Sequence, residues 1–259
     1  MEIRAMRVSA FFLFALLLAS PAFAESGEPM HPHSPPGGWP EKGVFGSYDR
    51  AALQRGLLVY KQVCAACHSL NLVAYRDLAA LGYSEAEIKA IAAEKTVADA
   101  PDDQGKIGER PARPSDHFVP PFANDQAARF ANNGALPPDL SLIIKARHGG
   151  EDYVYSLLTG FGHQPPADLK IMPGMNYNPY FPGGQIAMPP PLSDNAVAYG
   201  DGTAATTDQM AKDVVQFLAW AAEPHMEQRK RVGIRVMLFL LAMAGIFFAA
   251  KKRIWRDVH

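Results

Sequence analysis

Apolar side chains recur at helical spacing in several parts of the chain, which predicts a mostly helical protein. The clearest example follows Ser47, which is predicted to cap a helix that begins at Tyr48. One face of this helix is formed by five residues: Leu53, Leu57, Tyr60, Cys64 and Cys67. Since these positions share a face, we expect both thiols to point into the core, one turn apart.

Capping signals predict further helices after the first one. Ser84 with Glu87 forms a capping box that opens a helix to about Glu94, and Asn124 is expected to cap a short helix ended by Gly134. The other predicted helices are 139–147, 151–159 and a last one opened by Thr206 and Gln209. Long loops at 25–46, 95–123 and 160–205 separate them, and no stretch alternates in the manner typical of a strand.

The C-terminal end carries an apolar segment that predicts a membrane span. Residues 236–250 hold no charge, and extension back to Val232 gives 19 residues, or roughly 28 Å of helix. Arg235 lies inside the longer segment and would snorkel toward the headgroups. We therefore expect residues 224–250 to lead into and form a membrane anchor, followed by a cytoplasmic tail at 251–259.

The first 24 residues have the pattern of an export signal. A basic start at Arg4 and Arg7 precedes an apolar run at 11–18 and a small-residue cleavage site at Ala22-Phe23-Ala24. The run is too short to cross a membrane, so an N-terminal anchor is the weaker interpretation. Basic residues flank both sides of the C-terminal span, so the export signal decides the orientation and places residues 25–223 in the periplasm.

The charge of the exported part differs from that of the whole chain. The 259 residues have a formal net charge of −1, but residues 25–224 contain 15 Lys and Arg against 23 Asp and Glu, a balance of −8. An acidic domain above a membrane suits a basic diffusing partner, although solubility alone explains the charge equally well. The acidic stretch at Asp99, Asp102 and Asp103 is one candidate contributor, with a solvated loop as the alternative.

The only two cysteines lie in Cys64-Ala65-Ala66-Cys67-His68. A disulfide redox motif would need a βαβ context, and a zinc site would need a second cysteine pair, and the sequence has neither. A histidine directly after the second cysteine is typical of covalent haem attachment. We therefore predict one haem c, held by thioethers from Cys64 and Cys67, with His68 as an axial ligand of the iron.

The second axial ligand is not decided by spacing. The candidates are His117, His148, His163, His225, Met172, Met175, Met188, Met210 and Met226. Met210 and Met226 have apolar neighbours at helical spacing and are predicted core residues. Met172, Met175 and Met188 lie in a Pro-rich irregular stretch that could hold a thioether at the iron, and spacing does not choose among them.

Several motifs together resemble the cytochrome c1 family of bacterial type, the haem subunit of the ubiquinol–cytochrome c oxidoreductase, or bc1 complex. The resemblance covers nearly all of the mature chain. The matching blocks are Tyr48-Asp49-Arg50, Val59-Tyr60-Lys61, Val63-Cys64-Ala65-Ala66-Cys67-His68-Ser69, Arg147-His148-Gly149-Gly150-Glu151-Asp152-Tyr153, Asn178-Pro179-Tyr180-Phe181-Pro182-Gly183 and Ile186-Ala187-Met188-Pro189.

The resemblance implies a mostly α fold, a cytochrome c-like haem domain with long irregular loops and one C-terminal transmembrane helix. It implies that Met188 is the distal iron ligand. It further suggests that Arg147 and Tyr153 lie near a haem propionate. The suggested lining of the haem crevice is Asn132, Pro137 and Pro138.

The same resemblance implies electron transfer within a larger enzyme, with no turnover by the chain alone. The implied partners are cytochrome b, the Rieske iron–sulfur protein as electron donor, and a soluble or membrane-bound cytochrome c as acceptor, with no nucleic acid. Two alternatives are a free-standing membrane-anchored electron carrier and a haem enzyme such as a peroxidase. A single haem motif and a Met-ligated iron count against the peroxidase.

Overall fold

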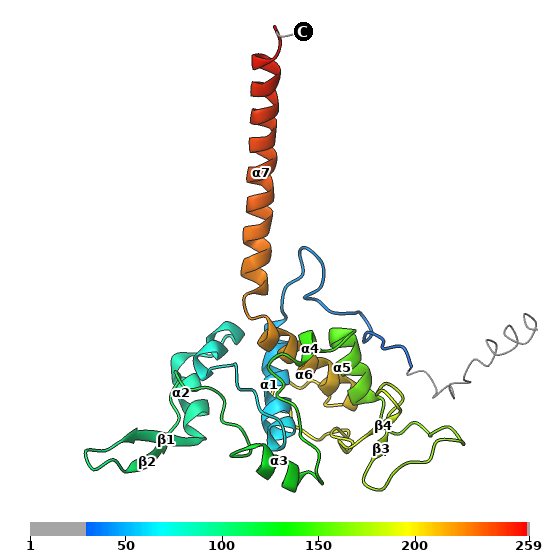
Figure 1. Cartoon of the computed structure of the whole chain (residues 1–259). Helices are drawn as coiled ribbons and strands as arrows, with labels where there is room; N and C mark the ends of the chain where they lie inside the picture. Colours follow the sequence, from blue (N-terminus) through cyan, green and yellow to red (C-terminus); the bar gives the residue numbers. More distant parts are fainter. Residues whose placement is uncertain (1–29, 258–259) are drawn as a thin grey trace, which may run out of the picture.

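The structure is a computed structural model that describes residues 30–257, which form a folded domain and one long projecting helix (Figure 1). The predicted export signal at 1–24 lies outside the described residues. The elements in chain order are α1 (Arg50–Gln62), η1 (Cys64–Ala66), η2 (Tyr75–Leu81), α2 (Glu85–Ala93), β1 (Thr96–Pro101), β2 (Ile107–Pro111), α3 (Asp125–Ala131), α4 (Ile143–Ala146), α5 (Gly150–Thr159), β3 (Asn176–Tyr177), β4 (Gln185–Ile186), α6 (Thr207–Ala222) and α7 (Met226–Ile254). The described chain is thus mostly helical, as predicted.

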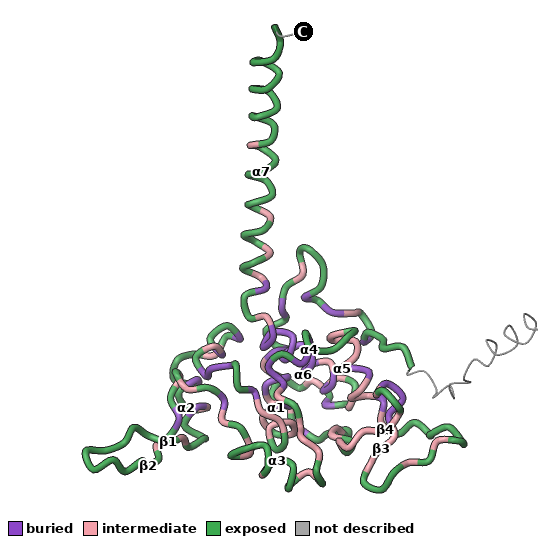
Figure 2. Tube along the Cα trace, viewed as in Figure 1, coloured by how far each residue is buried: buried purple, intermediate pink, exposed green. Residues whose placement is uncertain are grey.

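Helices α1 and α6 pack against each other at the centre of the domain. The predicted apolar face of α1 is buried here, with Leu53 and Leu57 at most 1% exposed. Gly56 in the middle of α1 adjoins Asp213, whereas the hydroxyl of Tyr48, before α1, donates to the carbonyl of Ala219 at 3.2 Å. The two helices are therefore antiparallel, and Figure 2 shows buried residues concentrated where they meet.

Helix α1 is shorter than predicted at both ends. It begins at Arg50 and is capped by Asp49, whose carboxylate accepts from the amides of Ala51 and Ala52. The predicted cap, Ser47, instead donates its amide to the carbonyl of Pro40 in the preceding loop. The predicted start and cap were therefore wrong, since a carboxylate next to the first turn satisfies two free amides and complements the helix dipole.

Most other capping predictions are confirmed. Ser84 and Glu87 form the full capping box at α2, and Asn124 caps α3. Thr206 accepts from the amide of Gln209 at the start of α6. These signals are reliable because each one is a hydrogen bond between residues only two or three positions apart.

The predicted helix at 139–147 was too long, since α4 covers only Ile143–Ala146. The reason is Asp139, whose carboxylate accepts from the amides of Asn71 and Ser141 instead of capping a helix. These bonds hold the chain in a turn before α4 starts, since short polar side chains compete with helical hydrogen bonding.

The expectation of no strands was wrong, because two short antiparallel hairpins are present. β1 pairs with β2, and β3 pairs with β4. Nearly all residues of β1 and β2 are exposed, so neither face of that hairpin is buried against a core. A strand pair without a buried face leaves no alternating pattern in the sequence.

Helix α7 leaves the domain alone after a break at Glu223–His225 that contains Pro224. It has 29 residues and a mean hydropathy of 2.3 over its apolar window, none of which is buried. Within residues 30–257 it is the one helix long and apolar enough to cross a membrane. Helix α7 begins two residues later than the predicted segment 224–250 and continues four residues beyond it. Met210 and Met226 are buried in the core, as predicted.

Candidate functional site

The Cys64–His68 segment lies at the end of the domain that faces away from α7. At the start of α1, the guanidinium of Arg50 pairs with Glu227 in the first turn of α7 at 2.8 Å. Helix α1 then runs for 13 residues, or about 20 Å. The helix therefore carries the motif to the side of the domain remote from the anchor (Figure 1).

The two cysteines differ in their surroundings. Helix α1 ends at Gln62, and the chain tightens into η1, where the amides of Cys67 and His68 both donate to the carbonyl of Cys64. Cys64 packs against the core, and burial raises the pKa of its thiol to about 12. Cys67 is exposed, so the expectation that both thiols point into the core was wrong for Cys67, which lies past the part of α1 that the core covers. Residues three apart in a 3₁₀ turn nevertheless lie on one side of it.

His68 is oriented by a hydrogen bond from the opposite segment. Its Nδ1 lies 2.8 Å from the carbonyl oxygen of Pro138. Since a carbonyl only accepts, Nδ1 carries the proton and the lone pair stands on Nε2. Burial lowers the pKa of His68, which keeps the ring neutral near pH 7. A neutral imidazole with one nitrogen held by a carbonyl is the form that ligates a metal.

The segment that supplies Pro138 also braces the chain after His68. The carboxylate of Asp139 accepts from the hydroxyl of Ser69, and the amide of Leu140 donates to the carbonyl of Ser69. The hydroxyl of Ser141 accepts from the amide of Leu72. The sequence did not predict the bond between Asp139 and Ser69, because the two residues are 70 positions apart.

Met188 follows the β3–β4 hairpin directly. Its carbonyl accepts from the side-chain amide of Asn176 at 3.3 Å, and the amide of Met172 donates to the side chain of Gln185 at 2.8 Å. The hairpin thus gathers the candidate methionines of this stretch into one loop region. Met188 and Met175 are half-buried, whereas Met172 is 56% exposed, which favours the first two as ligands.

The remaining predicted pocket residues all lie in the C-terminal half of the sequence. The side-chain amide of Asn132 donates to the carbonyl of Ala128 at the end of α3, and Arg147 is exposed beside α4. Tyr153 on α5 packs against the core, where burial raises its pKa. Pro137 is half-buried. Of the five predicted pocket residues, only Pro138 bonds to His68 within the part of the chain that the structure describes.

Two of the family-like blocks have structural roles that the sequence did not show. The carboxylate of Asp152 on α5 accepts from the indole of Trp39 at 2.6 Å and from the hydroxyl of Ser34 at 2.7 Å, which fastens the N-terminal segment to α5. Asn178 is fully buried and donates to the carbonyl of Leu157 at 2.8 Å. The Asn178 block therefore anchors the loop that leads to Met188 onto α5.

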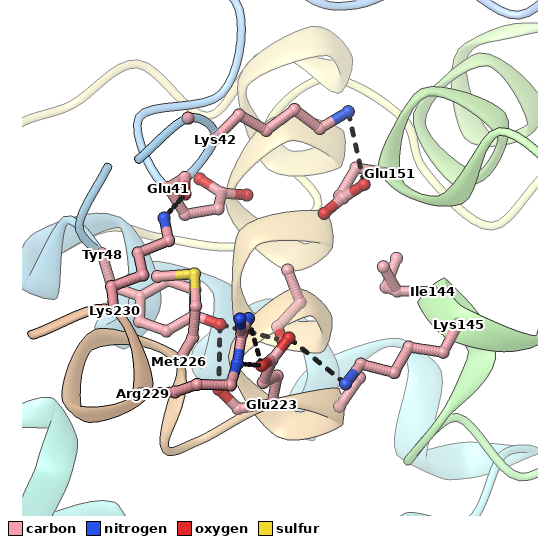
Figure 3. Close-up of a pocket in the computed structure, with 13 residues that line it drawn as sticks. Glu41, Lys42, Tyr48, Ile144, Lys145, Glu151, Glu223, Met226, Arg229 and Lys230 are labelled. Atoms are coloured by element: carbon pink, nitrogen blue, oxygen red, sulfur yellow. Dashed lines mark hydrogen bonds and ion pairs between the residues drawn. The ribbon is translucent and has the colours of Figure 1, made fainter. Parts of the chain in front are cut away.

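The residues present suit a covalently held haem. A neutral histidine, a half-buried thioether and two cysteines on one side of a turn are the donor set of a His/Met-ligated c-type haem. Among residues 30–257, no group of three or more His, Cys, Asp or Glu side chains is placed to hold a metal ion. A cavity of about 340 Å³, lined by Glu41 and Lys230 among others, lies at the opposite end of the domain, beside α7 (Figure 3).

Together, these features define a class: a largely helical domain with a C-x-x-C-H segment, borne on one C-terminal helix that is able to span a membrane. The sequence model described as "Cytochrome C1 family" matches residues 39–258. The chain belongs to the cytochrome c1 family.

Curated relatives agree with this membership. The chain is 53% identical over 239 residues to "Cytochrome c1 1, heme protein, mitochondrial" of Arabidopsis thaliana, covering 92% of this chain and 77% of the relative. It is 49% identical over 235 residues to "Cytochrome c1" of Rhodospirillum rubrum, covering 85% and 86%. It is also 49% identical to "Cytochrome b/c1" of Bradyrhizobium diazoefficiens, in an alignment that covers 87% of this chain and 36% of the relative.

Proposed function

We propose that this chain is the mono-haem electron-transfer subunit of a quinol–cytochrome c reductase. In this proposal one haem c is bound by thioethers from Cys64 and Cys67, with His68 and Met188 as axial iron ligands. The observation that carries it is the hydrogen bond of His68 to Pro138, which leaves Nε2 available beside the two cysteines. The family membership and the relatives' printed name of heme protein support the same assignment.

The bound haem would supply one-electron exchange between Fe(III) and Fe(II). The protein's own groups set how easily this happens. The carbonyl of Pro138 fixes the tautomer of His68, and the thioether of Met188 is a soft donor that favours Fe(II) and so raises the reduction potential. With His68 and Met188 both holding the iron, no position would remain for substrate, which argues against peroxidase activity.

The other pocket residues have proposed roles around the same group. Pro137 and Pro138 with Asn132 would line the crevice, since Pro138 already contacts His68 and Asn132 is held by Ala128. Arg147 is exposed, and its guanidinium, which donates one bond to the carbonyl of Ala146, has further N–H groups to offer a propionate carboxylate. Tyr153 would offer its hydroxyl to the same propionate.

The proposed topology follows from the two terminal segments. Residues 1–24 act as a cleaved signal peptide, and residues 25–223 form the periplasmic haem domain. Residues 224–250 lead into and form the anchor, and 251–259 remain in the cytoplasm. The exposed apolar surface of α7 supports the anchor, and the export signal sets the orientation, since basic residues stand at both ends of the span.

The proposed partners are cytochrome b, the Rieske iron–sulfur protein as donor and a soluble or membrane-bound cytochrome c as acceptor. Extraction of the membrane in mild detergent tests this arrangement. A c-type spectrum that co-purifies with b-type haem and an iron–sulfur subunit is the expected result. A c-type spectrum on this chain alone would instead support the free-standing carrier.

Replacement of Met188 tests the axial ligand. We expect Met188→Leu to keep the covalent haem, to lower its reduction potential and to let the iron bind carbon monoxide, because the thioether donor is lost. Redox titration and the carbon monoxide difference spectrum measure both effects. Met172→Leu and Met175→Leu are the matched controls from the same loop, and transfer of the effect to either one would reassign the ligand.

A further inference from the structure

The loop at residues 41–47, which we call the membrane-side loop, stands on the same side of the domain as α7 (Figure 1). Its tip is formed by Val44 and Phe45, which are 66% and 88% exposed. Nothing in the proposed electron transfer uses these side chains, since the Cys64–His68 segment lies at the other end of the domain.

The membrane-side loop is fastened to the start of α7 at both ends. The ammonium group of Lys230 donates to the carbonyl of Glu41 at 2.6 Å (Figure 3). It also donates to the carbonyl of Gly46 at 3.0 Å. The amide of Tyr48, which follows the loop, donates to the carboxylate of Glu227 at 2.8 Å. The tip is therefore held at a set height along α7.

That height coincides with the edge of the apolar segment of α7. Val44 and Phe45 line a groove of about 280 Å³ together with Ile234, on the third turn of α7. Val236, where the uncharged run begins, is only two residues further on. The tip thus reaches the level at which α7 enters hydrocarbon, if α7 spans a membrane as proposed.

The groove combines apolar and charged groups, as the boundary of a phospholipid bilayer does. Val44, Phe45 and Ile234 offer apolar surface, and Lys230 and Arg231 line the same groove. Glu227 also lines it, but its carboxylate is paired with Arg50 at 2.8 Å. Aromatic and aliphatic side chains settle at the boundary of headgroups and acyl chains, and basic side chains attract phosphate groups there.

We propose that the membrane-side loop inserts Val44 and Phe45 into the outer boundary of the phospholipid bilayer beside α7, with lipid phosphates near Arg231. The inference rests on the proposed membrane span of α7. This second contact limits the tilt of the domain on the membrane, because a single spanning helix can itself tilt within the bilayer.

The test uses the full-length protein in vesicles of phosphatidylethanolamine and phosphatidylglycerol. An environment-sensitive thiol label is attached at Phe45→Cys, and the control is Phe130→Cys. Phe130 is equally apolar and 92% exposed, and it lies on α3, at the end of the domain away from α7. Both substitutions fall on exposed side chains, so the fold is retained.

We expect the label at position 45 to emit at shorter wavelength than the label at position 130. We also expect lipid-borne quenchers to quench it more strongly, by about twofold or more. Equal quenching at the two positions would overturn the proposal. Quenching at position 45 that disappears when the chain is purified with its partner subunits would assign the loop to a protein contact and also overturn it. Wild-type chain taken through the same labelling reports separately on the proposed function, since a free Cys67, which is exposed, would react and a thioether would not.

Discussion

At the scale of single residues, a buried ion pair joins the two central helices. Two guanidinium nitrogens of Arg55 on α1 lie 2.9 Å from the two carboxylate oxygens of Asp213 on α6, whose side chain is fully buried. Arg55 also pairs with the more exposed Asp201 at 2.9 Å. Because a buried charge without its partner is strongly unfavourable, the pair constrains how α1 and α6 meet.

We expect Asp213→Asn to lower the free energy of unfolding by about 3 kcal/mol, because Arg55 would lose its buried partner. Denaturant unfolding of the full chain in detergent measures this loss. Asp201→Asn is the matched control and should cost much less, since solvent screens the pairing of its exposed carboxylate. Equal losses for the two variants would contradict a special role for the buried pair.

Glu41 is a second residue with an unusual environment. It is 3% exposed, and neither of its carboxylate oxygens has a hydrogen-bond partner among the described residues. Burial is the main cause that raises its pKa to about 7, and the nearby charges are Glu151, Lys42 and Lys230 (Figure 3). The folded protein therefore holds this proton at pH values where the unfolded chain, with a pKa near 4.5, has lost it.

A raised carboxyl pKa makes stability fall as pH rises. Between about pH 4.5 and 7 the folded state binds more protons at Glu41 than the unfolded state does, which lowers the free energy of unfolding by up to about 3 kcal/mol. We expect Glu41→Gln to remove this loss, so that the variant gains stability over the wild type as pH rises through this window. Thermal unfolding of both proteins from pH 4.5 to 8 measures it, and a constant difference across that range would contradict the raised pKa.

At the scale of elements, the contact between α1 and α6 depends on Gly56. A Cβ at this position would lie 2.1 Å from the carbonyl oxygen of Asp213 and 2.7 Å from the Cβ of Phe217. The helices can therefore approach this closely only with glycine at position 56.

We expect Gly56→Ala to destabilise the protein by about 1–3 kcal/mol, because the added methyl group forces the helices apart. Gly233→Ala in α7 is the control, since a Cβ there meets nothing within 4 Å and alanine favours helix. Thermal unfolding should separate the two variants. If Gly56→Ala were as stable as the control, the close approach would not limit packing.

The elements also differ in how far the sequence revealed them. The caps of α2, α3 and α6 were predicted correctly because each is a bond between near neighbours in the chain. The exposed hairpin of β1 and β2 was missed because it buries no face. The late start of α1 and the shortness of α4 were missed because Asp49 and Asp139 bind backbone groups that the apolar spacing does not report.

At the scale of the whole molecule, the domain carries an excess of negative charge and the start of α7 an excess of positive charge. The balance of −8 over residues 25–224 lies beside a strongly basic start of α7. On the β1–β2 hairpin, Asp99 pairs with Arg110 at 3.3 Å and Asp102 accepts from turn amides. Asp103 is the member of the predicted acidic stretch without such a contact among the described residues.

If the acidic domain docks a basic cytochrome c, electron transfer between them should slow about tenfold or more as salt rises from about 0.01 M to 0.1 M. Stopped-flow oxidation of the reduced chain measures this rate. Asp103→Asn should weaken the salt dependence more than Asp99→Asn, because the carboxylate of Asp99 already lies 3.3 Å from Arg110, which it shares with Asp116. A salt-independent rate would refute the docking and leave the haem proposal untouched.

By itself, the sequence determined the helical class, most helix starts, the apolar C-terminal helix and the C-x-x-C-H segment. These features depend on residues a few positions apart, and such neighbours meet whatever the rest of the chain does. The choice of Met188 came from family resemblance rather than from spacing, and it remains a prediction.

Only the tertiary structure decided which distant groups meet. His68 and Pro138 are 70 positions apart, Arg55 and Asp213 are 158 apart, and Lys230 and Glu41 are 189 apart. Contacts of this kind depend on how α1, α6 and α7 pack, which no local spacing encodes. That packing orients the histidine and leaves Glu41 buried, and it also sets Val44 and Phe45 beside the anchor.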